Sequence, residues 1–282
     1  MPKIIEIKEL DYTYLPGSPY EHKALKNINL SLEQGDFLGI FGPNGSGKST
    51  LAQQLNGLLC PNNGTVTVCN INTADKKLRQ ELWKKVSLVF QYPEQQIFQI
   101  TVYNEVAYGP RNLGISETEV QARVYNALQE VGLIPENTEH LTPMSLSGGM
   151  KRRVAIAGML ALKPEILILD EPMAGLDPLG RKLILDIIKN RQDKNETTVM
   201  ISHDLKEIIT VADKIAILDR GTLVFCGEVN QLLENTNILA HYRFELPDYL
   251  QVVYALADRE LDVNTNISSM KEAAMEISKF IV

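Results

Sequence analysis

The sequence predicts an α/β fold built around a phosphate-binding loop, and three observations support this prediction. Strand-like and helix-like patterns alternate along most of the 282 residues, which is typical of parallel strands joined by crossover helices. A short apolar strand at 36–41 leads directly into a glycine-rich segment at 42–50. A second apolar strand, Ile166–Leu169, ends in two adjacent carboxylates, Asp170 and Glu171. Carboxylates delivered by a strand beside a glycine-rich loop suit Mg-nucleotide chemistry.

Composition limits the classes of function. The net charge of −7 and the pI near 5.3 argue against a sequence-independent nucleic-acid binder, which needs a basic face. Three cysteines without a C-x-x-C pair favour a reducing cytosol over a disulfide framework or a zinc site. The longest apolar run, Val154–Leu162, is about half a membrane span and has charged flanks. We therefore expect no membrane crossing, and at a membrane the chain would dock onto another protein.

The first elements form the beginning of the nucleotide-binding core. Ile4–Tyr14 and Ala24–Leu32 read as strands, the second with period-two alternation. The buried strand 36–41 follows, and a helix is expected from about Lys48 to Gly57.

Between Tyr92 and Pro143 the pattern changes to loops and helices. Ser116-x-x-Glu119 is a capping box that opens an amphipathic helix, and Gly132 is its expected stop. We interpret this stretch as the main part of a helical insertion at about 92–160, between the two halves of the core.

The core resumes after Gly149 with a helix and the strand Ile166–Leu169. A helix at about Leu179–Lys194, the strand Thr197–Ile201 and two strands near 215–218 and 223–225 complete a domain at 1–227.

The remaining segment, 228–282, reads as a C-terminal helical region. One helical face is expected to consist of Leu246, Leu250, Val253, Ala257 and Leu261. Ser269-x-x-Glu272 is expected to cap a second helix that carries Ala273, Ile277 and Phe280. The pattern leaves open whether these faces pack on the main domain or form a partner surface.

The segment 42–50 fits G-x-x-x-x-G-K-[ST] in its required context, with a strand before it and a helix after it. Its glycines let backbone N–H groups converge on phosphate oxygens at a helix N-terminus. We expect Lys48 to reach the β- and γ-phosphates and the Ser49 hydroxyl to ligate Mg²⁺. The candidate ATP-binding residues of this loop are Gly42, Pro43, Asn44, Gly45, Ser46, Gly47, Lys48, Ser49 and Thr50.

The two carboxylates after the strand Ile166–Leu169 suggest separate roles. Asp170 is placed to enter the Mg²⁺ shell, whereas Glu171 projects differently and is placed to orient an attacking water as general base. A solvated acidic turn is the plain alternative. Pro172 and a further carboxylate at Asp177 argue against it.

The turn Leu146-Ser147-Gly148-Gly149-Met150 opens a helix and forms a second anion-binding end. One chain has little use for two such ends on one γ-phosphate. Taken alone, Ser147, Gly148 and Gly149 also fit an ordinary small-residue helix cap.

Together, the loop 42–50, the turn 146–150 and the strand with its carboxylates resemble the ATP-binding cassette family. The resemblance covers residues 1–227 closely. It implies a P-loop NTPase fold with a RecA-like core, an antiparallel β subdomain and a helical insertion. It also implies ATP and Mg²⁺ as cofactors and pairing of two ATPase subunits face to face, so that Ser147, Gly148 and Gly149 reach the ATP of the opposite subunit.

Three further residues take roles from this resemblance. Gln91, after the strand-like stretch 86–90, is similar to the glutamine that contacts Mg²⁺ and the attacking water. His203 is similar to the switch histidine that bonds the γ-phosphate. Tyr14 resembles the aromatic residue that stacks on adenine, although Tyr12 shares its strand face and either ring fits a core position. Met150 departs from the glutamine usual at its position, which puts fine contacts to the nucleotide of the opposite subunit in doubt.

Segments 17–25, 90–98 and 101–110 are similar to energy-coupling factor transporter ATPases, which include the cobalt and nickel import ATPases. This narrower resemblance implies an ATPase that powers import of a vitamin or a cobalt or nickel ion from the cytoplasmic face of the cell membrane. Its implied partners are a second ATPase (a copy or a paralogue), a transmembrane coupling subunit docking near Tyr92–Pro110, and a substrate-binding membrane subunit.

The alternatives are the ATPase of another importer, a soluble cassette acting in DNA repair or translation, and a non-hydrolysing nucleotide sensor. The sequence lacks the long coiled-coil insertions of repair members and the tandem cassettes of translation factors. Glu171 and His203 argue against the sensor. The cargo does not follow from the sequence.

Overall fold

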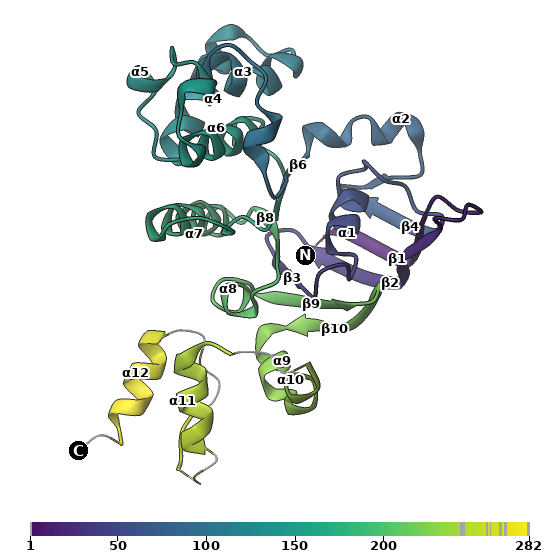
Figure 1. The fold of residues 1–282 in the computed structure, drawn as a ribbon, viewed down its shortest axis with the longest axis vertical. Coiled ribbons are helices and arrows are strands. Elements are labelled where there is room, and N and C mark those ends of the chain that lie inside the picture. Colours follow the sequence, from purple (N-terminus) through teal and green to yellow (C-terminus); the bar gives the residue numbers. More distant parts are fainter. Residues whose placement is uncertain are drawn as a thin grey trace.

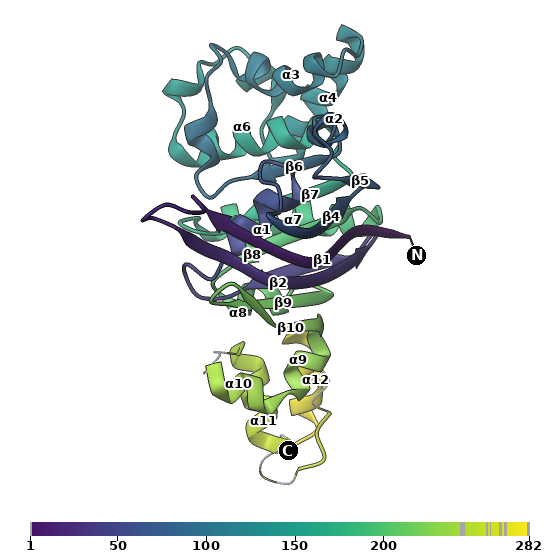
Figure 2. The same cartoon turned by 90° about the vertical axis from the view of Figure 1, so that its right-hand side faces the viewer.

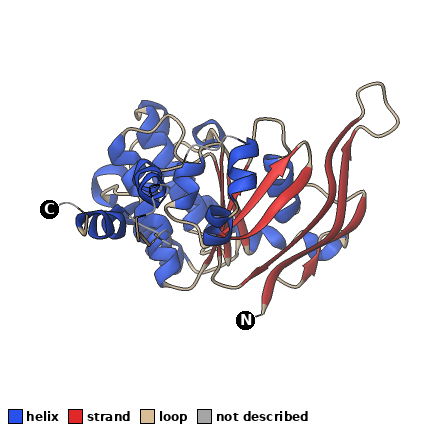
Figure 3. Ribbon diagram, turned by 90° about the horizontal axis from the view of Figure 1, so that it is seen from below, coloured by secondary structure: helices blue, strands red, loops and turns tan. Residues whose placement is uncertain are grey.

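The computed structural model describes residues 2–242, 246–257, 259, 261–264, 267 and 270–280. Two sheets occupy the middle of the molecule, with the inserted helices at one end and the C-terminal helices at the opposite end (Figure 1 and Figure 2). Seen from below, strands gather on one side and helices on the other (Figure 3). The predicted α/β fold is confirmed.

The larger sheet has six strands in the order β10-β9-β3-β8-β7-β6. The five strands β9, β3, β8, β7 and β6 run parallel to one another. In this sheet only the edge strand β10 is antiparallel, to β9. The strands are β3 (Phe37–Phe41), β6 (Val86–Val89), β7 (Ile166–Asp170), β8 (Thr197–Ser202), β9 (Lys214–Asp219) and β10 (Thr222–Glu228).

The smaller sheet is the expected antiparallel β subdomain, in the order β2-β1-β4-β5. Its last two strands escape sequence analysis because Asn63-Gly64 reads as a turn and only Val66 and Val68 of β4 are buried. The strands are β1 (Lys3–Tyr14), β2 (His22–Glu33), β4 (Asn63–Val68) and β5 (Ile71–Asn72).

Alternating side chains of the larger sheet supply two cores, because successive residues of a strand face opposite sides. Ile166 and Ile168 face the smaller sheet, in a core that also holds Leu51 of helix α1. Leu167 and Leu169 face the helices on the other side. The central strands are therefore buried on both faces, which explains their continuous apolar sequences.

The helices cover the outer face and both ends of the larger sheet. Helices α3, α4 and α6 pack against one another in the inserted segment, and Ser116 caps α4 as predicted by accepting a hydrogen bond from the Glu119 N–H at 3.3 Å. Among the described residues the α-helices are α1 (Lys48–Leu55), α2 (Lys76–Arg79), α3 (Val102–Asn112), α4 (Glu117–Glu130), α5 (Pro135–Thr138), α6 (Gly148–Leu160), α7 (Pro178–Asp193), α8 (Leu205–Ile209), α9 (Val229–Glu234), α10 (Thr236–Tyr242), α11 (Asp248–Ala257) and α12 (Met270–Ser278). Short 3₁₀ helices are η1 (Leu82–Lys84), η2 (Pro93–Gln96) and η3 (Pro143–Ser145).

The C-terminal helices correct one detail of the predicted apolar face. Leu250 and Val253 are buried as expected, but Leu246 and Leu261 lie outside α11. Pro247 fits only before or within the first turn of a helix, so Leu246 precedes α11. Leu261 follows the helix end and is 39% exposed.

The second expected C-terminal helix appears as α12. Its Ala273 is buried with Leu250 and Val253 in the core on the helix-covered side of the larger sheet. Ile277 packs against that core, and Phe280 is half-buried. The predicted cap, Ser269, lies outside the described residues. In the part of the chain that the structure describes, no helix combines the length and apolar character required of a membrane span.

Candidate functional site

Four strand ends bring the glycine loop, Gln91, Asp170, Glu171 and His203 to one edge of the larger sheet. Parallel strands end at a common edge, and the register pairs Phe41 with Ser202 and Asp170 with Ile201. The glycine loop therefore starts on one side of the strand that leads into His203, and Glu171 lies on the other side of that strand. Gln91 follows β6, the neighbour of β7.

The glycine loop is wrapped around the Lys48 ammonium. Lys48 Nζ donates hydrogen bonds to the carbonyl oxygens of Gly42 (2.7 Å) and Pro43 (3.1 Å). Gly47 takes φ +106°, and a Cβ there would meet the Ala24 carbonyl oxygen at 2.7 Å. Glycine at that position therefore lets the loop turn tightly into α1. The loop also buries Ser46, whose Oγ has no hydrogen-bond partner among the described residues.

Lys48, Ser49 and Asp170 form one electrostatic cluster. Burial lowers the pKa of the Lys48 ammonium, and the carboxylates of Glu171 and Asp170 act in the opposite direction. Burial raises the pKa of the Asp170 carboxyl, and a hydrogen bond from the Ser49 side chain opposes that shift.

This donor set fits a magnesium ion. Mg²⁺ prefers oxygen ligands and takes only one or two carboxylates from the protein, because substrate phosphates and waters complete its shell. The Ser49 hydroxyl and the Asp170 carboxylate provide such ligands. Across the described ranges, no group of three or more His, Cys, Asp and Glu side chains forms a metal cage.

Glu171 turns out of the strand direction. Its φ of +51° lies in the left-handed region, so its side chain does not continue the alternation of β7. Its N–H still donates to the Ile201 carbonyl oxygen at 2.9 Å, which keeps the residue beside β8. Strained backbone of this kind is concentrated at functional sites.

His203 contacts Glu171 directly. Its Nδ1 lies 2.8 Å from Glu171 Oε2, and its side chain is 61% exposed whereas that of Glu171 is 10% exposed. The imidazole therefore bridges a nearly buried carboxylate and the open side of the strand edge.

Tyr14 and Gln91 lie at the periphery of this cluster. The Tyr14 hydroxyl is 3.2 Å from Thr50 Oγ1, so the phenol lies over the start of α1. Tyr12 packs against the core between the sheets, and the two rings meet edge to face at 4.9 Å. These contacts favour Tyr14 over Tyr12 as the ring near a bound nucleotide. Gln91 is exposed beyond the end of β6.

The turn before α6 does not join the glycine loop within one chain. Ser147 caps α6 by accepting a hydrogen bond from the Met150 N–H at 3.3 Å, and Ser147, Gly148 and Gly149 are exposed. The turn opens into a cavity of about 360 Å³ that is also lined by residues 175–177 before α7. No residue of 42–50 lines that cavity. The two anion-binding ends are therefore separate sites on this chain.

Two functional candidates escape sequence analysis. Arg152 donates to the Glu171 carbonyl oxygen at 3.0 Å, yet in sequence it belongs to a Lys-Arg-Arg run that reads as a charged helix flank. Glu207 accepts a hydrogen bond from Ser202 Oγ at 2.8 Å, and burial raises the pKa of its carboxyl. A lone Glu at the start of a short helix carries no sequence signal.

Comparison with known proteins identifies the family. The family model described as ABC transporter matches residues 25–174. The energy-coupling factor transporter ATP-binding protein EcfA2 of Clostridium acetobutylicum is 42% identical over 279 residues, which is 98% of each chain. EcfA2 of Lactobacillus gasseri is 46% identical over 86% of this chain and 85% of its own length. The chain belongs to the ABC transporter family, among its energy-coupling factor ATP-binding proteins.

Solved structures agree with this membership. The structure of cbiO1 from Clostridium perfringens, described as part of the ABC transporter complex cbiONQ, superposes with a TM-score of 0.74. It is 34% identical and covers 86% of this chain and 94% of its own. A dimeric ATP-binding cassette in a post-hydrolysis state, with bound ADP and phosphate, gives a TM-score of 0.71 at 30% identity, covering 80% of this chain and 98% of its own.

The ABC cassette also has an apolar groove beside its inserted helices. A cavity of about 350 Å³ is lined by aromatic side chains, namely Trp83, Phe90, Phe98 and Tyr108. Of the apolar residues at 97–100 in the predicted docking segment, Ile97 is buried, whereas Phe98 (61%) and Ile100 (77%) are exposed. The Phe98 and Tyr108 rings meet edge to face at 4.9 Å.

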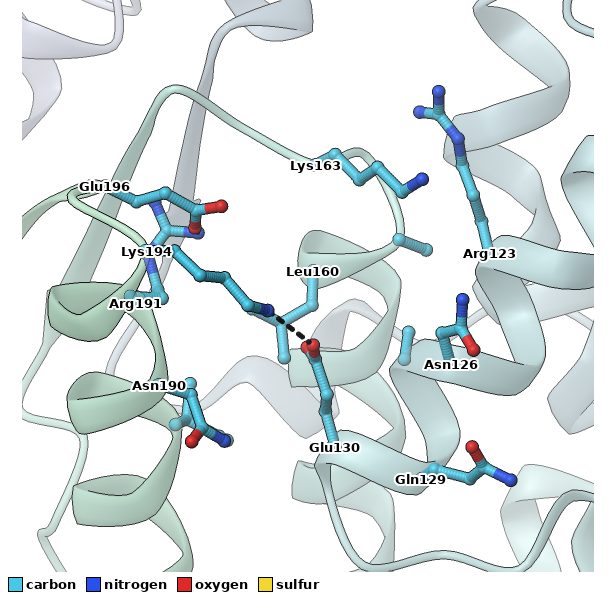
Figure 4. A pocket seen from close by; sticks show the side chains of 13 residues that line it. Arg123, Asn126, Gln129, Glu130, Leu160, Lys163, Asn190, Arg191, Lys194 and Glu196 are labelled. Atoms are coloured by element: carbon cyan, nitrogen blue, oxygen red, sulfur yellow. Dashed lines mark ion pairs between the residues drawn. The ribbon is translucent and has the colours of Figure 1, made fainter.

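A further cavity, of about 630 Å³, lies between α4, α6 and α7 (Figure 4). Four of its charged groups form two pairs, with Lys194 Nζ at 3.5 Å from Glu130 Oε1 and Arg191 Nη1 at 2.7 Å from Glu196 Oε2. None of the predicted site residues lines it, so it is not the nucleotide site.

Proposed function

We propose that this ABC ATPase powers the import of a micronutrient, a vitamin or a cobalt or nickel ion, through separate membrane subunits. Membership of the energy-coupling factor ATP-binding proteins makes it an ATP-hydrolysing subunit. The names of its relatives support an energy-coupling factor transporter, and cbiO1 is described as part of an ABC transporter complex. The cargo class follows the resemblance of segments 17–25, 90–98 and 101–110 to energy-coupling factor ATPases. The observation that carries the hydrolytic part is the contact between Glu171 and His203 at the edge of the glycine loop.

Each side chain of the site has a distinct task in the proposed reaction. The N–H groups of 42–50 and the Lys48 ammonium bind the β- and γ-phosphates of ATP. Ser49, Asp170 and Gln91 would hold Mg²⁺, the last partly through water, and the ion would neutralise charge on those phosphates when bound. Glu171 accepts a proton from the attacking water as the water oxygen bonds to the γ-phosphorus and the bond to ADP breaks. His203 fixes the Glu171 carboxylate and bonds the γ-phosphate.

A second ATPase subunit completes the site in this proposal. Ser147, Gly148 and Gly149 are exposed at the N-terminus of α6, and they lie apart from the loop of their own chain. The N–H groups of a helix start bind anions. Two chains facing each other would therefore hold each ATP between the glycine loop of one chain and the Ser147–Gly149 turn of the other. The second subunit in this arrangement is either a copy of this chain or a paralogue. A related cassette forms a dimer in its solved structure.

The aromatic groove supports docking of a transmembrane coupling subunit near Tyr92–Pro110. Exposed apolar rings along a concave surface suit an amphipathic helix that lays its apolar face into a groove. The ATPase chain itself would therefore be a peripheral protein at the cytoplasmic face of the membrane. A separate membrane subunit would bind the cargo.

A charge placed in the groove tests this proposal. Phe98→Glu is expected to leave ATP hydrolysis by the purified chain within about twofold, since Phe98 lies outside the nucleotide site. It is expected to abolish co-purification with membrane subunits and cargo uptake by cells. The matched control is Ile134→Glu, in the same inserted segment with a similar exposure of 60%. Unchanged complex formation and uptake in the Phe98 variant would place docking elsewhere.

A further inference from the structure

Arg152 is a buried cation that donates hydrogen bonds to the backbone at and after Glu171. It lies on α6 and is only 7% exposed. Its Nη2 donates to the carbonyl oxygens of Glu171 (3.0 Å) and Pro172 (2.8 Å), and its Nη1 donates to that of Ala174 (3.0 Å). The guanidinium therefore fixes the turn that sets the direction of the Glu171 side chain, from the helix that also carries Ser147.

Glu94 is an acidic residue on η2, the element that packs beside α6. Burial lowers the pKa of the Arg152 guanidinium, and the charge of Glu94 is the main opposing influence. Glu94 Oε2 and Arg152 Nε are both buried, and neither has a hydrogen-bond partner in the part of the chain that the structure describes.

Among the described residues no hydrogen bond joins the Glu94 and Arg152 side chains, so the two charges do not form a closed ion pair. A buried polar atom without a partner costs desolvation free energy. If the two side chains had only a structural role, we would expect them to form the missing hydrogen bond. A small shift of η2 relative to α6 would instead change the distance between the Glu94 and Arg152 charges, and with it their attraction. The 93–96 turn belongs to the proposed docking segment and packs against α6. Movement of a docked partner would therefore displace this turn relative to Arg152.

We infer that Arg152 is a positioning residue through which the 93–96 turn sets the place of Glu171. Among the described residues the Arg152 side chain donates hydrogen bonds to the carbonyl oxygens of Glu171, Pro172 and Ala174 and to no residue of the glycine loop. Its effect on turnover runs through the carbonyl of Glu171 and the turn behind it. This inference rests on the proposed role of Glu171 in hydrolysis.

A double-mutant cycle on the full-length chain tests the coupling. We expect Arg152→Met to lower the rate of ATP hydrolysis about tenfold or more, with the affinity for a fluorescent ATP analogue within about twofold. Glu94→Gln, which removes only the charge, is expected to lower the rate about threefold in the native background. It is expected to have no further effect in the Arg152→Met background, because the residue that transmits it is gone.

Two further variants separate the contact from general effects. The exchange Glu94→Gln with Gln95→Glu keeps net charge and composition but moves the carboxylate to an exposed side chain, so it is expected to remain slow. Arg152→Lys keeps the charge with fewer directed donors, and its rate is expected to lie between those of native and Arg152→Met chains. If Arg152→Met does not fold, Arg152→Lys takes its place in the cycle.

Additive effects of the two substitutions, or full rescue by the Glu94/Gln95 exchange, would overturn the inference. A large loss of ATP affinity in a folded Arg152 variant would do the same. Glu171→Gln in the same assay separates the two levels of explanation. Normal turnover in that variant would exclude Glu171 as the general base. Slow turnover in that variant, together with additive effects of the Glu94 and Arg152 substitutions, would exclude only the coupling between these two residues.

Discussion

Gly47→Ala tests whether the glycine loop has the conformation that binds phosphate. A non-glycine residue in left-handed backbone costs about 1–2 kcal/mol, and Gly47 has φ +106°. The new Cβ would lie 2.7 Å from the Ala24 carbonyl oxygen, so reaching an ordinary 3.4 Å contact moves the loop by 0.7 Å. Such a shift weakens hydrogen bonds to charged phosphate, which are worth roughly 1.5–3 kcal/mol each.

The strain and one weakened bond amount to about 2.5–5 kcal/mol, or roughly 70- to 5,000-fold in affinity. The matched control is Gly45→Ala, where φ is +77° and nothing lies within 4 Å of the new Cβ. That variant is expected to lose only about 5–30-fold, from the backbone term alone. Titration with a fluorescent ATP analogue measures both. Equal affinities of the two variants would refute the loop geometry as the cause.

Further substitutions examine the rest of the site. His203→Ala is expected to slow single-turnover hydrolysis about 10–100-fold with little change in ATP affinity, and normal turnover would exclude its contact with Glu171 from the mechanism. Asp170→Asn is expected to abolish hydrolysis and to stabilise the Mg-free chain at pH 7. Burial raises the pKa of the Asp170 carboxyl, so its native-state charge costs stability at pH above that pKa and nothing at pH below the ordinary aspartate value. Urea unfolding at pH 7 and near pH 3 measures this, and an equal difference at both would contradict it. The Glu171→Gln chain is expected to sediment as a dimer with MgATP, and Ser147→Glu to prevent that by placing a carboxylate at the anion-binding turn. A chain that stays monomeric would require a paralogue as the second subunit.

The fold could be predicted where local sequence determines local structure. The central strands are buried on both faces, so Ile166–Leu169 and Thr197–Ile201 read as continuous apolar runs. Ser116 and Gly132 mark the ends of α4 because capping and positive φ (+67° at Gly132) have their own residue preferences. Strands β4 and β5 were missed because β4 begins with Asn63-Gly64, a pair typical of turns. Both short strands are stabilised by pairing, β4 with β1 and β5 with β4, which sequence periodicity does not report.

The same division holds for the site. The loop 42–50 and the carboxylates at 170–171 are contiguous, so their spacing reveals them. The contact between His203 and Glu171 joins residues 32 positions apart, and only the register of β7 and β8 brings them together. Arg152 is harder still, because its three acceptors are backbone carbonyls that have no residue identity.

Hydrolysis by the Glu171→Gln chain is the most direct test of the account. Glutamine keeps the size and hydrogen-bonding capacity of the side chain but cannot accept the proton of the attacking water. ATP affinity is expected to stay within a few-fold of native, since the phosphate-binding residues are untouched. The hydrolysis rate under single-turnover conditions is expected to fall by roughly 10²–10⁴, the usual contribution of a general base. A rate near that of the native chain, with ATP bound equally well, would contradict the placement of catalysis at the end of β7.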